Sequence, residues 1–409
     1  MVSSEMASSV LPNSLSHTRA GIHISSLDER ILKGQTDSKE RADRETTQEY
    51  FVNMGPQHPS THGVLRLVLR MDGETVRDVI PVLGYVHRGM EKKAEYVGYR
   101  QQVHFTDRLD YLSAVMGNWA MSSAIEKAMK TELNDRIETI RTIVAELTRI
   151  QSHQLWWGVL GMDLGAFTPF LYGFRDREKI TAIFEETMGG RLTMNYIQPG
   201  GLMFDIHPDF VANVKKFISY FKPLIEEYEE LFGGNVIVQE RLKNVGILDA
   251  KSAISLGVTG PILRASGVAH DLRKLEPYGV YAKTKFNVPV GTVGDCWDRY
   301  QVRMQEMRES ISIIEQLIDN VPEGKHMVMK FGAKIRVPEG VYYSQMETAR
   351  GIFGIFIASD GSEKPYRMHF RTPNFNNLWA ITQMAAGGRV GDLVAILSSI
   401  DIVVPDIDR

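Results

Sequence analysis

The feature that most constrains the fold is a change of hydrophobic period along the chain, from two to 3.6 and back to two. Beyond residue 88, apolar side chains recur at helical spacing in three long runs, which puts them on one face of each helix. We therefore expect several long amphipathic helices that share a core. Residues 107–129 and a segment from Thr168-Pro169 to about Met188 are two further predicted helices. The apolar positions of the three runs are Ile137, Ile140, Val144, Leu147 and Ile150; Phe210, Val214, Phe217, Phe221, Leu224, Tyr228 and Leu231; and Met304, Met307, Ile311, Ile314 and Ile318.

Alternating apolar and polar residues, the period of a β-strand, flank this helical stretch on both sides. Near the N-terminus, two such runs enclose an Asp72-Gly73 turn and predict a β-hairpin. A second antiparallel region is expected near the C-terminus, and short helical patterns follow it. The predicted strands are residues 50–54, 64–70, 75–83, 330–337, 341–347, 354–359 and 366–370, and the late helices are residues 374–386 and 392–399.

The sequence contains no internal repeat and no low-complexity linker between these segments, which favours one domain. We predict a single α+β domain over residues 49–409, with a helical core of long packed helices and flanking antiparallel β elements. Residues 1–48 are rich in Ser, Thr and charged residues and lack apolar periodicity, so we expect an extended N-terminal arm there. This arm is expected to be neither a transit peptide nor a secretion signal.

Composition argues against several classes of function. The 409 residues include 47 Lys and Arg against 50 Asp and Glu, so no general basic field favours nucleic acid. The single cysteine, Cys296, cannot supply the ligand set of an iron–sulfur cluster or a structural zinc, and no metal site is expected. No stretch approaches the roughly 20 apolar residues that span a bilayer, so membrane association would be peripheral.

The loop Gly55-Pro56-Gln57-His58-Pro59-Ser60-Thr61-His62-Gly63 is the first candidate for chemistry. Its two prolines and two glycines fix a tight path, from which His58 and His62 project their imidazoles. A stiff loop is a suitable mount for a proton-transfer group. Taken alone, however, the pattern favours hydrogen-bonded structural histidines.

Two further patterns place polar groups beside apolar segments. In Asp107-Arg108-Leu109-Asp110-Tyr111, helical spacing would put Arg108 and Tyr111 on the same face. Asp163 follows a strongly apolar helix, and a buried carboxylate there needs a partner. Taken alone, the pattern around Arg108 and Tyr111 favours a surface ion pair beside a tyrosine at the edge of the core. Taken alone, the position of Asp163 favours a carboxylate that caps the local backbone.

Other common site patterns are absent from the sequence. The sequence contains several Gly-Gly pairs, but none stands in the G-x-G-x-x-G or P-loop spacing. Neither a nicotinamide site nor a nucleotide site is therefore expected. No H-E-x-x-H metal motif and no G-x-S-x-G nucleophile motif is present. The three candidates above therefore carry the functional prediction.

Six segments, in the same order along the chain, resemble the D-type catalytic subunit of respiratory complex I, the NADH-quinone oxidoreductase. They are GPQHPSTHGVLRL, LGYVHRGMEK, DRLDYL, MDLGAFTPF, NYIQPGG and DIVVPDIDR, and the match runs from about residue 50 to the last residue. That family is related to the large subunit of nickel–iron hydrogenases, so the resemblance implies a similar α+β fold. Hydrogenases hold their metal with paired cysteines, whereas Val403 and Asp406 occupy two of those positions here. A nickel–iron centre has no ligands in this chain, and the resemblance implies a vacated cavity that takes a quinone between apolar walls such as Val403 and Val404.

The resemblance also implies roles for individual residues. In that family, the second loop histidine and the tyrosine hydrogen-bond the quinone headgroup, which implies His62 and Tyr111 here, with His58 in support. The acid of the M-D-x-G motif pairs with the loop histidine, which implies Asp163. The arginine three residues before the tyrosine, Arg108 here, lies near the terminal [4Fe-4S] cluster of the neighbouring B-type subunit.

These roles imply a quinone-reducing subunit that couples electron transfer to proton translocation. Its substrate would be menaquinone or ubiquinone, and no cofactor would be covalently bound. Its partners would be the B-type and C-type subunits, other subunits of the hydrophilic arm and the membrane arm, with NAD(H) bound only by other subunits. We expect a peripheral place on the cytoplasmic side of a bacterial inner membrane, with the mitochondrial matrix side as the alternative.

Three other functions remain open at the level of sequence. The chain would serve equally in a ferredoxin-dependent quinone oxidoreductase, since neither electron donor would bind it. A membrane-bound hydrogenase large subunit is disfavoured by the missing cysteine ligands. A structural relative without chemistry is disfavoured because His62, Tyr111 and Asp163 occur together.

Two positions depart from the commoner family pattern. Many relatives carry histidine where Thr193 stands and arginine where Gln198 stands. That histidine is a titratable group linked to the potential of the cluster. Its absence leaves the pH dependence of that potential open and favours a low-potential quinone such as menaquinone.

Overall fold

The structure is a computed structural model, and it describes residues 49–61, 63–332 and 334–409. The predicted arm over residues 1–48 and the predicted quinone ligand His62 lie outside the described residues. The backbone of Pro59 is described, but its side chain is not.

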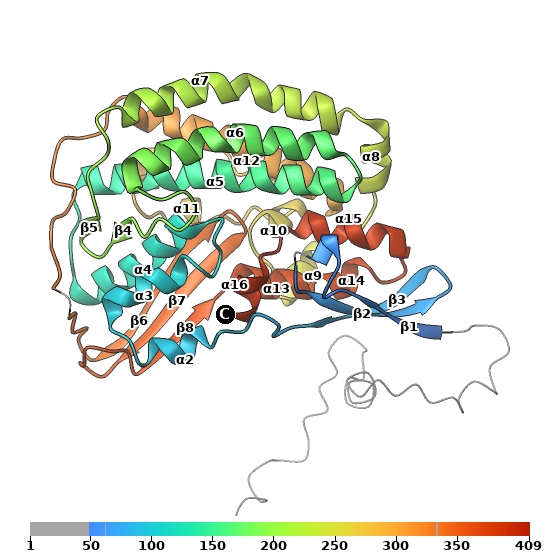
Figure 1. Ribbon diagram of the computed structural model, residues 1–409, viewed down its shortest axis with the longest axis horizontal. Coiled ribbons are helices and arrows are strands. Elements are labelled where there is room, and N and C mark those ends of the chain that lie inside the picture. The colour runs from blue at the N-terminus through green and yellow to red at the C-terminus, as the bar shows by residue number, and fades with distance from the viewer. Residues whose placement is uncertain (1–48, 62, 333) are drawn as a thin grey trace, which may run out of the picture. The chain divides into compact units, whose positions relative to one another are not determined.

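Four long helices form one layer of the domain, seen at the top of Figure 1. They are α5 (Asp135–Asp163), α6 (Phe167–Met188), α7 (Phe210–Tyr228) and α12 (Cys296–Ile318). The three predicted amphipathic runs are confirmed in α5, α7 and α12, except for Leu231, which lies beyond the end of α7 and is exposed. The start of α5 is fixed by Asn134, whose side chain accepts a hydrogen bond from the backbone N–H of Ile137.

A three-stranded antiparallel sheet lies below the long helices, with strand order β6 (Gly340–Thr348), β7 (Gly351–Ser359) and β8 (Arg367–Arg371). Helix α4 (Ala114–Met129) packs against β6 and β7. Thr348 pairs with Gly351, so Ala349 and Arg350 form the tight turn between the two strands. This turn carries Arg350 into the buried interior, which becomes important for the candidate site.

The predicted N-terminal hairpin is confirmed as part of a second sheet, with order β1 (Glu49–Met54), β2 (Arg66–Asp72) and β3 (Thr75–Val82). The loop with the two histidines connects β1 to β2. Shorter elements complete the domain: the 3-10 turns Pro59–Thr61 and Tyr281–Lys283, the π-helical turn Glu229–Gly233, the strands β4 (Ile197–Gln198) and β5 (Gly201–Leu202), and the helices α2 (Met90–Ala94), α3 (Tyr99–Thr106), α8 (Val236–Leu242), α9 (Ala250–Ser255), α10 (Pro261–Ala265), α11 (Leu272–Leu275), α13 (Pro373–Trp379), α14 (Ile381–Met384), α15 (Val390–Ile400) and α16 (Val404–Asp408).

The prediction of one helix over residues 107–129 is wrong. Helix α3 ends at Thr106, α4 begins at Ala114, and turns lie between them. The Asp110 carboxylate accepts a hydrogen bond from the backbone N–H of Leu112 at 3.2 Å. Such a local bond offers the backbone an alternative to the helix. Arg108 and Tyr111 therefore do not share a helical face.

Two smaller predictions also differ from the structure. The helix expected to start with Thr168 as its N-cap and Pro169 as its first residue starts two residues earlier, with Ala166 as its N-cap and Phe167 as its first residue. The predicted strand over residues 330–337 is not formed in its described part. Its carbonyl groups bond to side chains instead: Phe331 accepts from Arg100, and Val337 accepts from Ser359.

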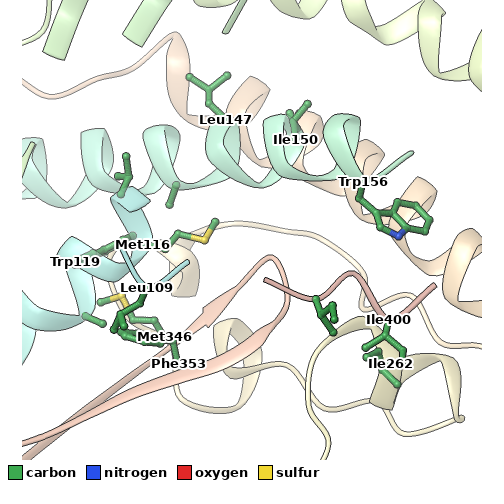
Figure 2. Packing of buried hydrophobic residues seen from close by; sticks show 14 of the residues in the cluster. Leu109, Met116, Trp119, Leu147, Ile150, Trp156, Ile262, Met346, Phe353 and Ile400 are labelled. Carbon is green, nitrogen blue, oxygen red and sulfur yellow. The ribbon is translucent and has the colours of Figure 1, made fainter. Parts of the chain in front are cut away.

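One buried hydrophobic cluster joins the helical layer to the sheet. In Figure 2, Leu147 and Ile150 of α5 lie above Met116, while Leu109 lies with Met346 and Phe353 of the sheet. Trp156 of α5 points toward Ile400 at the end of α15, and its indole N–H donates to the Ser398 carbonyl at 2.9 Å. None of the helices in the described residues is long and apolar enough to cross a membrane.

Candidate functional site

The loop between β1 and β2 is held by its own hydrogen bonds. The Thr61 hydroxyl donates to the carbonyl oxygens of Pro56 and His58, at 3.1 and 2.7 Å. The backbone N–H of Ser60 donates to Nδ1 of His58 at 3.2 Å, although the His58 ring remains exposed. Thr61 is fully buried, so the loop is anchored from within, as its prolines and glycines predict.

Asp163 is the last residue of α5 and meets this loop. The Ser60 hydroxyl donates to its Oδ1 at 3.2 Å, and its buried Oδ2 has no hydrogen-bond partner among the described residues. Burial raises the pKa of Asp163, while the hydroxyls of Ser398 and Ser60 and the charge of His58 lower it, and the net pKa is raised. The C-terminal end of a helix also disfavours a negative charge. The predicted partner His62 lies outside the described residues, and Ser60 is a partner that sequence reasoning missed.

Tyr111 and Arg108 lie in the turns between α3 and α4. Tyr111 is 38% exposed, and burial of part of its side chain raises the pKa of the phenol, which therefore stays protonated at neutral pH. The Arg108 guanidinium donates to the His104 carbonyl at 2.9 Å, and Arg88 donates to the Arg108 carbonyl at 2.6 Å. Arg108 thus closes the end of α3.

A buried cluster of charges stands behind Tyr111. Arg350 donates to both carboxylate oxygens of Asp110 at 3.2 Å and to the Ser152 hydroxyl at 2.9 Å. It also donates to Oδ1 of Asp401 at 2.9 Å. The pKa of Tyr111 responds to the charges of Arg350, Asp110 and Asp401, so the phenol lies within their field.

The C-terminal segment lies against the same cluster. The predicted wall residues Val403 and Val404 are only 3% and 2% exposed, so they pack beneath the site. The Asn374 side chain accepts from the Val403 backbone N–H at 3.2 Å and donates to Oδ2 of Asp406 at 2.7 Å. The fold thereby brings the DIVVPDIDR and DRLDYL motifs together.

Arg350 and Asp163 mark two different positions along α5. Arg350, behind Tyr111, bonds to Ser152 of α5, whereas Asp163 ends that helix. Eleven residues of α-helix correspond to about 16 Å. Ser152, which bonds to Arg350, and Asp163 are therefore about 16 Å apart along the helix axis.

Of the two departures from the family pattern, Gln198 is linked through Asn195 to His104 at the end of α3. The Gln198 amide donates to Oδ1 and to the carbonyl of Asn195, both at 2.9 Å. Asn195 in turn lies 3.4 Å from Nε2 of His104. Buried Asp107 stands nearby, and its pKa is raised to about 7 by burial. Among the described residues, no group of three or more His, Cys, Asp and Glu could hold a metal ion.

Sequence reasoning missed Arg350 and the acids around it. Asp110, Asp401 and Asp406 all stand inside quoted motifs, so the motifs gave a signal for their importance. Arg350 lies in the tight turn of an ordinary strand pair and carries no motif of its own. Only its place in the fold identifies it.

Comparisons with known proteins agree with the predicted family. The family described as "Respiratory-chain NADH dehydrogenase, 49 Kd subunit" matches residues 163–334 and 326–409. The chain is 53% identical over 362 residues to the C/D-type subunit of the NADH-quinone oxidoreductase of Bacteroides thetaiotaomicron, covering 88% of this chain and 68% of that protein. It is 49% identical over 362 residues to the D-type subunit of the NADH-quinone oxidoreductase of Desulforamulus reducens, covering 88% and 99%.

A solved structure shares the fold. A chain from the "membrane-bound sulfane sulfur reductase (MBS), an archaeal respiratory membrane complex" matches with a TM-score of 0.85 and 35% identity, over 88% of this chain and 98% of that chain. The predicted fold class, α+β of the nickel–iron hydrogenase large-subunit type, is confirmed. The prediction of a subunit of a respiratory-chain oxidoreductase is confirmed as well. The chain belongs to the family of the 49 Kd subunit of respiratory-chain NADH dehydrogenase.

Proposed function

We propose that this chain forms the quinone-reduction site of an NADH-quinone oxidoreductase and couples quinone reduction to proton translocation. The observation that carries the proposal is Tyr111, a partly exposed phenol set in front of a buried charge cluster. A tyrosine of this kind is accessible to a ligand and is held in a fixed electrostatic field. The D-type and C/D-type relatives, which are named as parts of NADH-quinone oxidoreductases, supply the reaction class.

Quinone reduction needs proton donors because it adds two electrons and two protons to one molecule. A quinone dianion in a dry pocket would be very unfavourable, so donors must stand within hydrogen-bond reach of the two carbonyl oxygens. Tyr111 supplies one proton as a neutral phenol. His62 supplies the other as an imidazolium, with His58 in support.

Asp163 orients His62 and stabilises its cationic form in this proposal. About 16 Å of helix separates Asp163 from Ser152, which bonds to Arg350, and in this proposal His62 and the quinone headgroup lie between Asp163 and Tyr111. When His62 gives up its proton, Asp163 faces a changed field. Because its Oδ1 is bonded to Ser60 of the loop, that change reaches the loop directly and starts the conformational response that drives proton translocation.

Electrons would come from a [4Fe-4S] cluster on a B-type partner, near Arg108. The only cysteine of this chain, Cys296, is buried in the core, so the chain does not supply the cluster ligands. A C-type partner is supported by the name of the C/D-type relative. We further propose a place in the hydrophilic arm, peripheral to the membrane, on the cytoplasmic side of a bacterial inner membrane.

Two other electron routes fit the same fold. A ferredoxin-dependent quinone oxidoreductase would use this chain unchanged, because the donor binds elsewhere. The likeness to a sulfane sulfur reductase makes sulfur reduction a second candidate. The higher identity to the NADH-quinone oxidoreductase relatives favours quinone as acceptor.

The experiment that tests this function is Tyr111→Phe in the assembled complex, beside Tyr366→Phe at a 73% exposed tyrosine as the matched control. We expect electrons to reach the terminal cluster in both variants. Loss of a direct proton donor should slow quinone reduction by roughly 100-fold or more in Tyr111→Phe only. Normal quinone turnover in Tyr111→Phe would contradict the proposal. A Tyr111→Phe variant that lost sulfane sulfur reduction and kept quinone reduction would contradict it as well.

A further inference from the structure

Asp406 of α16 is a fully buried carboxyl group without an ion-pair partner among the described residues. Its Oδ2 accepts from the Asn374 amide at 2.7 Å, and its Oδ1 has no hydrogen-bond partner in the same part of the chain. An ionised carboxylate in such surroundings is very unfavourable, because water is excluded and no cation compensates for it. The neutral form is therefore favoured.

The neighbouring cations are already engaged elsewhere. Arg350 pairs with Asp110 and Asp401. The Arg371 guanidinium, at the end of β8, donates to the carbonyl oxygens of Ile352 and Gly257 and to the Thr259 hydroxyl. Of the three buried carboxyl groups, Asp110 and Asp401 thus pair with the Arg350 guanidinium, and Asp406 does not.

Arg303 is a further cation close to this group, and it faces Asp401. It donates to backbone carbonyl oxygens, among them that of Ser399 at 2.9 Å. The field of this arginine lowers the pKa of Asp401, but burial prevails and the net pKa is raised to about 6. For Asp406, burial and the negative charge of Asp110 raise the pKa to about 7, against smaller lowering effects of Asn374 and Arg350.

We propose that Asp406 stores an exchangeable proton at neutral pH and recharges the Tyr111 phenol through the cluster of Asp110, Arg350 and Asp401. This inference rests on the proposed function, since it assigns the source of one of the two protons. Asp406 does not touch the substrate in this scheme and is a proton-storing residue rather than a catalytic one.

The proposed step moves protons only. Tyr111 gives its O–H proton to a reduced quinone oxygen and becomes a tyrosinate. The O–H bond of the Asp406 carboxyl breaks, its proton passes to the tyrosinate, and the carboxylate is later reprotonated from solvent. Electrons arrive separately through the complex, so no additional reductant is required.

A small cavity borders Asp110, one member of this cluster. Its volume is about 10 Å³, close to the smallest space that holds one water molecule. The Ser113 hydroxyl is buried and has no hydrogen-bond partner among the described residues, so it would serve such a water. The cavity is lined by Thr106, Asp110, Ser113, Gly117, Thr348, Phe353 and Pro373.

The first experiment measures proton storage without using activity. Infrared difference spectra of the assembled complex, between about pH 5.5 and pH 8.5, should contain the carbonyl band of a buried protonated carboxyl with a midpoint near 7. Asp406→Asn should remove the band, and Asp406→Glu should retain it with a shifted midpoint. Asp78→Asn, at a buried carboxyl on β3, is the matched control and should change nothing. A band that persists in Asp406→Asn would overturn the inference.

The second experiment measures the use of the stored proton. Quinone reduction by the wild-type complex should fall as pH rises through about 7, because Asp406 loses the proton that it supplies. Asp406→Asn should be slower below that pH, by less than the roughly 100-fold expected for a direct donor, and should lose this pH dependence. An unchanged pH profile would contradict the recharging role. If the band behaves as expected while Tyr111→Phe turns over normally, the proposed function fails and proton storage stands.

Discussion

Two buried groups of charges lie within the same core and differ in protonation. The first, which we call the arginine network, consists of Glu146, Arg149, Arg264, Asp271, Arg273, Glu306 and Glu347. The second, the Arg350 cluster, consists of Asp110, Arg350, Asp401 and Asp406. Both are excluded from water, so burial by itself does not explain the difference between them.

The acids of the arginine network have close partners. Arg264 lies 2.8 Å from both Glu306 and Glu347, and Arg273 lies 2.6 Å from Asp271. Burial alone would raise the pKa of Glu306, but Arg264 and His153 outweigh it and hold the pKa well below its usual range. In the Arg350 cluster, by contrast, the pKa values of Asp401 and Asp406 are raised to about 6 and about 7.

The comparison teaches that pairing decides which buried acid carries a proton. Glu306, with a close arginine partner, has a lowered pKa and stays ionised, whereas the pKa is raised for Asp401, which shares Arg350 with Asp110, and most for Asp406, which has no ion-pair partner among the described residues. Asp401, one of the two acids with a raised pKa, contributes to the electrostatic field at Tyr111, where the proposed chemistry needs protons. In the proposed function, the arginine network supports the fold and the Arg350 cluster supplies protons.

The largest expected effect comes from breaking the arginine network with Glu306→Gln. This change removes one of the two carboxylates that lie 2.8 Å from buried Arg264, and breaking a buried ion pair should cost about 3–5 kcal/mol of the free energy of unfolding. The measurement is chemical denaturation of the isolated chain together with its level in assembled complex. Glu315→Gln, on the same helix in an exposed pair with Lys222, is the control and should cost less than about 1 kcal/mol. If both changes lowered the free energy of unfolding equally, the stabilising role of the arginine network would be contradicted.

The second expected effect is a pH dependence of stability that comes from the Arg350 cluster. Asp406 has a pKa of about 7 in the folded protein and about 4 in an unfolded chain. Its contribution to stability is therefore fully present below about pH 4 and is lost as pH rises through about 7. The loss corresponds to up to about 4 kcal/mol. Thermal unfolding between about pH 5 and pH 8 should reveal a decline in the wild type that is reduced in Asp406→Asn, and an equal decline in both would refute this account.

The sequence predicted the scaffold better than the cluster. The spacing of Ile137, Ile140 and Val144 was enough for α5, because a local period reports which face of a helix is buried. The turn at Asp110 was missed, since its side chain competes with the helix for backbone hydrogen bonds. Arg350 could not be predicted, because it and Asp110 are 240 residues apart in the sequence and meet only in the fold. Motifs identified Tyr111 and Asp163, but not the charges that set their protonation.

The third prediction concerns the loop side of the site. Asp163→Asn should slow quinone reduction by roughly 10-fold or more, as for other carboxyl groups that orient a histidine, and should weaken proton translocation with it. The measurement is steady-state quinone reduction with proton pumping in sealed vesicles. Asp209→Asn, at an exposed carboxyl before α7, is the control. If both activities were unchanged in Asp163→Asn, the role proposed for Asp163 would be abandoned.

The smallest expected effect is that of Ser60→Ala. The change removes one hydrogen bond of about 3.2 Å to Asp163 and should cost roughly 1 kcal/mol. Because that bond lowers the pKa of Asp163, its loss should raise the pKa further and shift the pH profile of quinone reduction upward. A Ser60→Thr variant, which retains the hydroxyl, should restore the profile. If the pH profile of quinone reduction stayed the same in Ser60→Ala, the hydrogen bond from the loop to Asp163 would have no role in the reaction.

The location of the quinone is the central claim, and a photoreactive quinone analogue tests it most directly in the assembled complex. The account predicts covalent labelling of peptides that contain residues 55–63 and 107–113, with Tyr111 at the centre of the labelled surface and with protection by excess unlabelled quinone. The account would be contradicted if the labelling that excess quinone prevents were found only on other segments or on partner chains.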